Sequence, residues 1–117
     1  MIYVQWVPSG NDWAEGAWAE AVNAFGARQW QGEEVDARVL VQPLHGKNVQ
    51  GEVDLKSFDH PKGDVLYIFG PDNGHLDTAP TCDAKVYIAQ VKQSVTLWSH
   101  QAAAIVLHDR MTKNGDS

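Results

Sequence analysis

Hydrophobic residues follow a helical spacing in some parts of the chain and form short continuous runs in others. Between residues 14 and 25 they recur at every third or fourth position, which indicates a helix with one buried side. Short apolar runs bounded by turn residues indicate buried strands. The predicted strands are residues 1–7, 35–41, 65–69 and 85–88, and the predicted helices are residues 12–25 and 99–111.

The ends of these helices carry residues that favour helix termini. Asp12 is the predicted N-cap of the first helix, because Glu15 follows at the spacing of a capping box. Gly26 suits the left-handed conformation that often ends a helix. Ser99 is the predicted N-cap of the last helix. Residues 102–107 make that helix apolar on nearly all sides, so we expect it to be buried, partly by a partner subunit.

Strands that alternate with helices predict an α/β fold, with a mostly parallel sheet and helices on both faces. Residues 48–58 are ambiguous and are expected to form a short helix. Sheets of this kind bind ligands in the loops beyond the carboxyl ends of their strands. The loops after Val41, Phe69 and Ile88 are therefore the candidate site.

Length and charge narrow the class of protein. The 117 residues suit one domain, predicted over residues 1–111 with a polar tail at 112–117. The formal charge is −6, and the nine Lys and Arg residues are scattered. Since proteins that bind nucleic acids neutralise phosphates with basic side chains, this balance disfavours strong RNA binding by the chain alone.

Other residue types exclude several kinds of site. Cys82 is the single cysteine, so an internal disulfide and a cysteine-based zinc site are excluded. The histidines show no metal-ligand spacing, and we expect no metal site. No signal-peptide pattern and no membrane-length apolar run is evident, which predicts a cytoplasmic protein without a membrane partner. Trp13, Trp18 and Trp30 are expected to anchor the core or an interface.

Two segments in order resemble the SpoU-type RNA 2′-O-methyltransferases of the SPOUT superfamily. Residues 65–76 run from a buried strand into Phe-Gly-Pro-Asp at 69–72, where the family has Phe-Gly-Pro-Glu and then a Gly-Leu pair. Residues 85–109 hold a strand, a short loop and a helix, where the family has Ile-Pro, a Ser-x-Asn-Leu-Ser signature and a helix ending like Ala-Ile-Val-Leu-Tyr-Glu. The amino-terminal half matches more loosely, through a turn with Asn11 and a helix ending in Ala-Phe-Gly at 24–26.

This resemblance implies a minimal α/β-knot domain with a deep trefoil knot in its C-terminal half. It also implies S-adenosylmethionine as cofactor, 2′-O-ribose methylation of tRNA or rRNA, and a homodimer through the first and last helices. Adenine recognition uses apolar walls and backbone groups, and glycine permits close approach. By position, the expected cofactor contacts are Gln42, Pro43, Gly70, Ile88 and Thr96.

Several positions depart from the family's pattern. The family carries a catalytic Arg on the first helix, and Glu20 stands at that position here. The Asn of the last signature falls on Trp98, and its neighbouring Ser falls on His100, next to Ser99. The candidate catalytic residues are Glu20, His100 and Ser99, and the candidate substrate-binding residues are Asp72, Asn73 and Trp98.

These departures leave the activity open. Glu20 cannot replace an Arg as a cation, although either Glu20 or His100 could act as a base. Trp98 could stack on a nucleobase, or it could plug the site or a dimer interface. The chain is therefore either a methyltransferase with rebuilt chemistry or a catalytically degenerate protein that binds S-adenosylmethionine or another nucleotide. A purely structural dimer is the third hypothesis.

Overall fold

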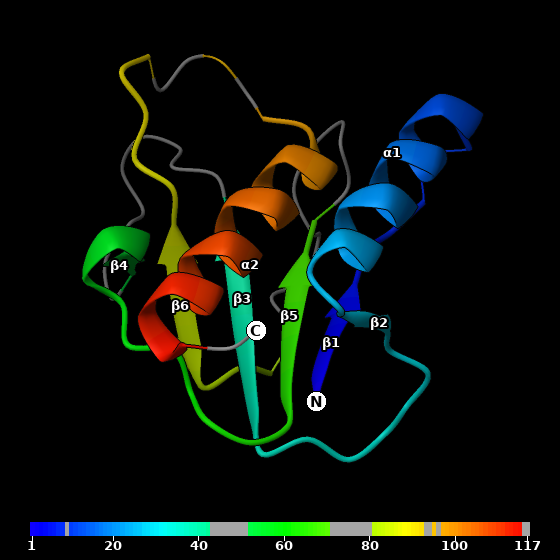
Figure 1. Cartoon of the computed structure of the whole chain (residues 1–117). Coiled ribbons are helices and arrows are strands. Elements are labelled where there is room, and N and C mark those ends of the chain that lie inside the picture. Colours follow the sequence, from blue (N-terminus) through cyan, green and yellow to red (C-terminus); the bar gives the residue numbers. More distant parts are fainter. Residues whose placement is uncertain (9, 43–51, 71–80, 93–94, 96, 116–117) are drawn as a thin grey trace.

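In a computed structural model, the protein forms a single six-stranded sheet with α-helices packed against it (Figure 1). The structure describes residues 1–8, 10–42, 52–70, 81–92, 95 and 97–115. Its elements are β1 (Ile2–Gln5), α1 (Asp12–Ala24), β2 (Arg28–Gln29), β3 (Ala37–Gln42), β4 (Val53–Asp54), the 3-10 helix η1 (Leu55–Ser57), β5 (Val65–Phe69), β6 (Ala84–Tyr87) and α2 (Ser99–Asn114). The strand order is β2-β1-β5-β3-β6-β4, and every pair of neighbours is parallel.

The predicted α/β fold with a parallel sheet is confirmed. The run at 65–69 forms β5, in the interior of the sheet, and all five of its side chains are buried. The sequence pattern gave no sign of β2 and β4, because two residues are too short to show a periodicity. The short helix expected within residues 48–58 is the 3-10 helix η1, preceded by β4; residues 48–51 lie outside the described part.

Both α-helices lie on the same face of the sheet, side by side (Figure 1). The prediction of helices on both faces is therefore wrong for the described part of the chain. Alternate residues of a strand point to opposite faces, so the sheet has a second apolar face. That second face holds Leu40, Leu66 and Ile68, packed with Tyr3, Trp30, Val35 and Cys82. Among the described residues, the irregular segment that carries Trp30 and Val35 takes the place of a helix there.

The helix ends differ from the predicted caps. The N-cap of α1 is Asn11 rather than Asp12, because the Asn11 side chain accepts hydrogen bonds from the backbone of Trp13 and Ala14. An N-cap residue must itself lie outside the helix, and Asp12 is already helical. The predicted stop at Gly26 is confirmed, since its φ is +69°.

In α2 the N-cap is Trp98, and Ser99 is the first helical residue. The side chain of Gln101 accepts a hydrogen bond from the backbone N–H of Trp98 at 2.9 Å, so the cap uses no side chain of residue 98. The helix continues to Asn114 and stops at Gly115, whose φ is +68°. The helix thus extends three residues past its predicted end at 111, into the segment predicted as a polar tail.

The apolar run of α2 has one buried side. Ala103, Val106 and Leu107 are buried in the core, whereas Ile105 is 41% exposed. The spacing of the three buried residues is that of one helix face, which packs beside α1 over the sheet. The expected partner subunit stays a prediction.

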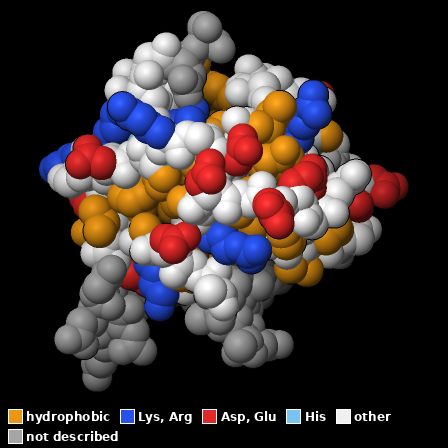
Figure 2. Space-filling model, turned by 90° about the horizontal axis from the view of Figure 1, so that it is seen from below, with side chains coloured by type: hydrophobic (Ala, Val, Ile, Leu, Met, Phe, Trp, Pro, Cys, Tyr) orange, Lys and Arg blue, Asp and Glu red, His pale blue; other side chains and the backbone are white. Residues whose placement is uncertain are grey.

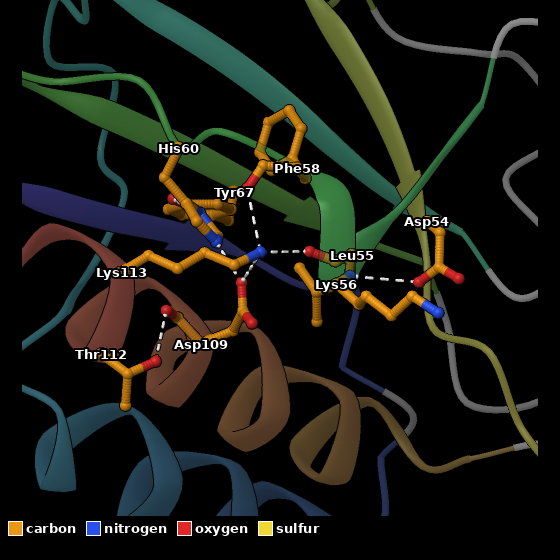
Figure 3. Close-up of polar contacts among 9 residues, drawn as sticks. All are labelled: Asp54, Leu55, Lys56, Phe58, His60, Tyr67, Asp109, Thr112 and Lys113. Carbon is orange, nitrogen blue, oxygen red and sulfur yellow. Dashed lines mark hydrogen bonds and ion pairs between the residues drawn. The ribbon is translucent and has the colours of Figure 1, made fainter.

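A chain of polar contacts connects η1, the sheet and the end of α2 (Figure 3). The His60 ring is buried, with Nδ1 2.7 Å from the Tyr67 hydroxyl and Nε2 2.7 Å from Asp109 Oδ2. A carboxylate can only accept, so Nε2 carries the proton in the neutral ring, and Nδ1 then accepts from the Tyr67 hydroxyl. Lys113 Nζ lies 2.9 Å from the same carboxylate and donates to the carbonyls of Leu55 and Phe58.

This polar chain makes stability depend on pH. Burial lowers the pKa of His60 from its ordinary 6.5, although Asp109 opposes that effect. The unfolded chain then binds a proton at this residue at a higher pH than the native protein does. We therefore expect stability to be full above pH 6.5 and to fall as the pH drops below that value, by up to about 1.4 kcal/mol per pH unit. Urea unfolding at a series of pH values measures this, and a flat profile between neutral and mildly acidic pH would contradict it.

Charges of both signs are mixed on the surface. On the side seen in Figure 2, acidic side chains are spread between basic and apolar ones, without a large basic region. The described helices include none long and apolar enough to cross a membrane.

Candidate functional site

Three strands end together at the edge that the sequence marked as the candidate site. In the parallel sheet β3 lies between β5 and β6, with Val41 paired to Phe69 and Gln42 paired to Tyr87. Because parallel strands place their carboxyl ends at one edge, the chain leaves the sheet at neighbouring points there.

This register brings together three of the predicted cofactor contacts. Gln42 is the last residue of β3, Gly70 follows β5 and Ile88 follows β6. All three are partly buried, and Ile88 packs against the main core. Pro43 and Thr96, the other two predicted contacts, lie outside the described residues, as do Asp72 and Asn73. The binding role of each remains a prediction.

The first residue of α2 is fastened to this edge. Ser99 Oγ donates a hydrogen bond to the carbonyl of Gly70 at 2.8 Å, and Ser99 is only 7% exposed. The bond joins residues 29 positions apart and fixes the start of α2 beside the end of β5. In this geometry the Ser99 hydroxyl positions the backbone, and its catalytic role stays a prediction.

The side chain of Gln90 holds the loop between β6 and α2. Its amide nitrogen donates to the Val95 carbonyl at 2.7 Å and to the Lys92 carbonyl at 3.3 Å. The N–H of Val95 also donates to the Lys92 carbonyl, at 3.3 Å, which closes a turn. Gln90 was not among the residues picked from the sequence, because no pattern marks a side chain that bonds to the backbone of its own loop.

Three aromatic rings gather where the two α-helices begin, and we call Trp13, Trp98 and His100 the aromatic cluster. The centroid of Trp13 lies 5.1 Å from that of Trp98 and 5.4 Å from that of His100, with both pairs edge to face. The centroids of Trp98 and His100 are 6.1 Å apart. His100 Nδ1 is buried and finds no hydrogen-bond partner in the part of the chain that the structure describes.

The tryptophans divide between core and surface. Trp18 is buried and stacks on Trp6 at 5.0 Å, which confirms it as a core anchor, and Trp30 packs on the second face of the sheet. Trp13 is 60% exposed, so it does not anchor the core, and its role at an interface stays a prediction. Trp13 lies one residue before Ala14, outside the row of buried residues on α1. This position could have indicated its exposure from the sequence.

Glu20 lies apart from the buried side of α1. It is exposed and follows Trp18 by two positions, which turns it to the far side of the helix from the core. His100 follows Ser99, which is bonded to Gly70, so it lies near the candidate site. The catalytic roles of Glu20 and His100 stay predictions. The described residues contain no group of three His, Cys, Asp or Glu side chains that could hold a metal ion.

Solved structures with a similar fold are found, although no protein-family model and no curated protein matches the sequence. A probable methylase family protein from Haemophilus influenzae Rd KW20 superposes with a TM-score of 0.70 at 11% identity, over 98% of this chain and 68% of the other. An AdoMet-bound rRNA methyltransferase from Sinorhizobium meliloti gives 0.72 at 16% identity, over 95% and 56%. The SpoU methyltransferase AviRb from Streptomyces viridochromogenes, in complex with AdoMet, gives 0.69 at 13% identity, over 100% and 58%.

These similarities concern the fold and the length over which it is shared. The chain spans little more than half the length of the second and third structures and about two-thirds of the first. The identities are too low to carry an activity from one chain to another. The chain therefore has the α/β fold of these methyltransferase structures.

Proposed function

We propose that the protein is an S-adenosylmethionine-dependent RNA methyltransferase of SpoU type that acts on the ribose 2′-hydroxyl of tRNA or rRNA. One observation carries the proposal: Gln42, Gly70 and Ile88 meet at adjacent strand ends, with α2 fastened to Gly70 through Ser99. The similarity of fold to methyltransferase structures, two of them with AdoMet, supports it.

The residues at this edge fit an adenosine-like cofactor. Ile88 supplies an apolar wall, Gly70 has no side chain to block close approach, and Gln42 brings an amide that both donates and accepts. S-adenosylmethionine carries its methyl group on a positively charged sulfur, and an oxygen nucleophile can take that group while S-adenosylhomocysteine leaves. His100 is the candidate to take the hydroxyl proton, because an imidazole can accept one and His100 adjoins Ser99, which is bonded to Gly70.

Three further features belong to the same proposal. The trefoil knot would form where the chain passes from β5 through β6 to α2, and the bond between Ser99 and Gly70 supports a close crossing there. An experimental structure with α2 outside these loops would exclude the knot. A homodimer would use the exposed sides of α1 and α2, including Ile105, and analytical ultracentrifugation with Ile105→Glu tests it. The expected setting is the cytoplasm.

The proposed function is tested first by cofactor binding and then by methyl transfer. Calorimetric titration with S-adenosylmethionine and S-adenosylhomocysteine measures cofactor binding. Transfer of a labelled methyl group to tRNA and rRNA measures activity, and resistance of the product linkage to alkali identifies the 2′-oxygen as the acceptor. Cofactor binding without transfer to any RNA pool would contradict the enzyme and leave the non-catalytic alternative, and absence of cofactor binding would contradict both.

Gln90→Ala is expected to weaken S-adenosylmethionine binding without unfolding the protein. The variant loses the two hydrogen bonds that close the loop after β6, so the cofactor must order that loop on binding. We expect the dissociation constant to rise several-fold, up to about tenfold. Gln31→Ala is the matched control, because Gln31 is exposed in the segment after β2. Equal affinities for the two variants would show that the loop needs no side-chain support.

A further inference from the structure

The aromatic cluster has more exposed ring surface than the fold requires. Trp13 is 60% exposed and Trp98 is 37% exposed, although each is large enough to serve as a core residue. Neither belongs to the main core, whose tryptophans are Trp6 and Trp18. Neighbouring exposed aromatic rings mark a binding surface more often than a structural one.

The cluster is rigidly placed beside the proposed cofactor site. The backbone of Trp98 is fixed twice, through its N–H to the Gln101 side chain at 2.9 Å and through its carbonyl to the N–H of Ala102 at 3.0 Å. The next residue, Ser99, is bonded to Gly70. Trp13 meets the Trp98 ring edge to face, at an interplanar angle of 80°. A ligand that stacks on this surface therefore finds it already ordered.

We propose that the aromatic cluster binds an unpaired nucleobase of the RNA substrate, with Trp98 as the stacking surface and Trp13 holding that indole in place. This inference rests on the proposed function for the identity of the ligand. Every nucleobase has a flat π-face that stacks on an indole, and a base inside a duplex cannot offer that face. The cluster thus selects an unpaired nucleotide rather than a helical segment.

The same geometry relates the stacked base to the candidate proton acceptor. The centroid of the His100 ring lies 6.1 Å from that of Trp98, so a base stacked on Trp98 lies close to the candidate proton acceptor. We therefore expect the stacked base to belong to the nucleotide that is methylated.

The charge of the chain sets how this binding responds to salt. With 9 basic and 15 acidic residues, the protein can neutralise few phosphates, so stacking must supply much of the affinity. A binder with one or two phosphate contacts on a single strand loses less than about tenfold in affinity between about 50 and 200 mM salt. A binder that depends on many basic side chains loses far more.

The test measures the fluorescence anisotropy of an end-labelled RNA single strand made only of adenine nucleotides. The strand is titrated with the protein in the presence of saturating S-adenosylmethionine. We expect the single strand to bind with weak salt dependence and an RNA duplex of equal length to bind much less tightly. Trp98→Leu keeps an apolar side chain without a π-face and should raise the dissociation constant about tenfold or more, whereas Trp98→Phe should restore most of the affinity. The helix cap survives both changes, because it uses the backbone of Trp98.

Controls separate this inference from the proposed function. Val53→Ala, at an exposed apolar residue on edge strand β4, should bind RNA like the wild type, and circular dichroism should show all variants folded. Equal affinity of Trp98→Leu and the wild type, preference for the duplex, or no binding of RNA would each overturn the inference. Cofactor affinity is measured separately on the same samples. If the protein binds S-adenosylmethionine but fails these RNA tests, the inference about the aromatic cluster is wrong, while the proposed cofactor site stands.

Discussion

His60→Ala is expected to destabilise the protein by about 2–4 kcal/mol at neutral pH. The change removes the acceptor of the buried Tyr67 hydroxyl and the donor to Asp109 in one step. Tyr67 is fully buried in β5, so its hydroxyl cannot turn to water for a new partner. Arg110 can donate to the Tyr67 oxygen but cannot accept its proton, and a buried O–H left without an acceptor costs about 1–3 kcal/mol. The lost ring contact with Phe58 adds to this cost. Urea unfolding followed by circular dichroism measures the difference.

The matched control is His108→Ala, at a residue of α2. His108 is exposed, with an edge-to-face contact to Phe25 at 6.2 Å, and its removal should change stability by no more than about 0.5 kcal/mol. His60→Ala should also lose the decline in stability below pH 6.5, because the group that titrates is gone. If both variants unfold at the same urea concentration, the polar chain contributes nothing.

Gly63→Ala is the second large effect and is expected to cost about 2–4 kcal/mol. Gly63 has a φ of +88°, a conformation that a residue with a side chain adopts only under strain. A Cβ at this position would also overlap the Asp36 carboxylate. That carboxylate accepts a hydrogen bond from the N–H of Asp64 at 2.9 Å, so it cannot move aside without losing the bond.

The corner around Gly63 matters because it joins the amino ends of three strands. Asp64 Oδ1 lies 2.9 Å from the amino group of Met1, which precedes β1, and the Asp64 carbonyl accepts from the N–H of Asp36, which precedes β3. Gly32→Ala separates strain from overlap, since Gly32 has a φ of +97° and nothing within 4 Å of the added carbon. We expect Gly32→Ala to cost about 1 kcal/mol. Equal thermal midpoints for the two alanine variants would rule out the overlap with Asp36.

The sequence was informative where one element could be identified from its own residues. The apolar run at 65–69 is β5, and the helical spacing from residue 14 onward is α1, because burial forces these periodicities on any chain that forms such elements. The caps were less certain: Asp12 and Ser99 carry the right side chains, but the helices begin where Asn11 and Trp98 leave the extended conformation. A shift of the cap by one residue leaves the hydrophobic pattern of the helix unchanged, so the pattern does not fix the exact cap residue.

For the candidate site, the order of the strands mattered more than their positions in the sequence. The loops after β3, β5 and β6 were predicted as a site, and the sheet order places those three strands next to one another. The bond between Ser99 and Gly70, the support of the loop by Gln90, and the contact of Trp13 with Trp98 were not predicted. Each depends on the three-dimensional path of a side chain, which hydrophobic periodicity does not describe.

The sequence by itself determined the α/β class and the positions of the main strands and helices, because these follow from local burial patterns. It also predicted which strand ends would form a ligand site, because parallel strands place their carboxyl ends at one edge. Only the tertiary structure decided that both α-helices cover one face, that Trp13 is exposed beside Trp98, and that His60 connects Tyr67 to Asp109. These contacts join residues from 7 to 85 positions apart along the chain, and their formation depends on how the whole sheet brings the elements together.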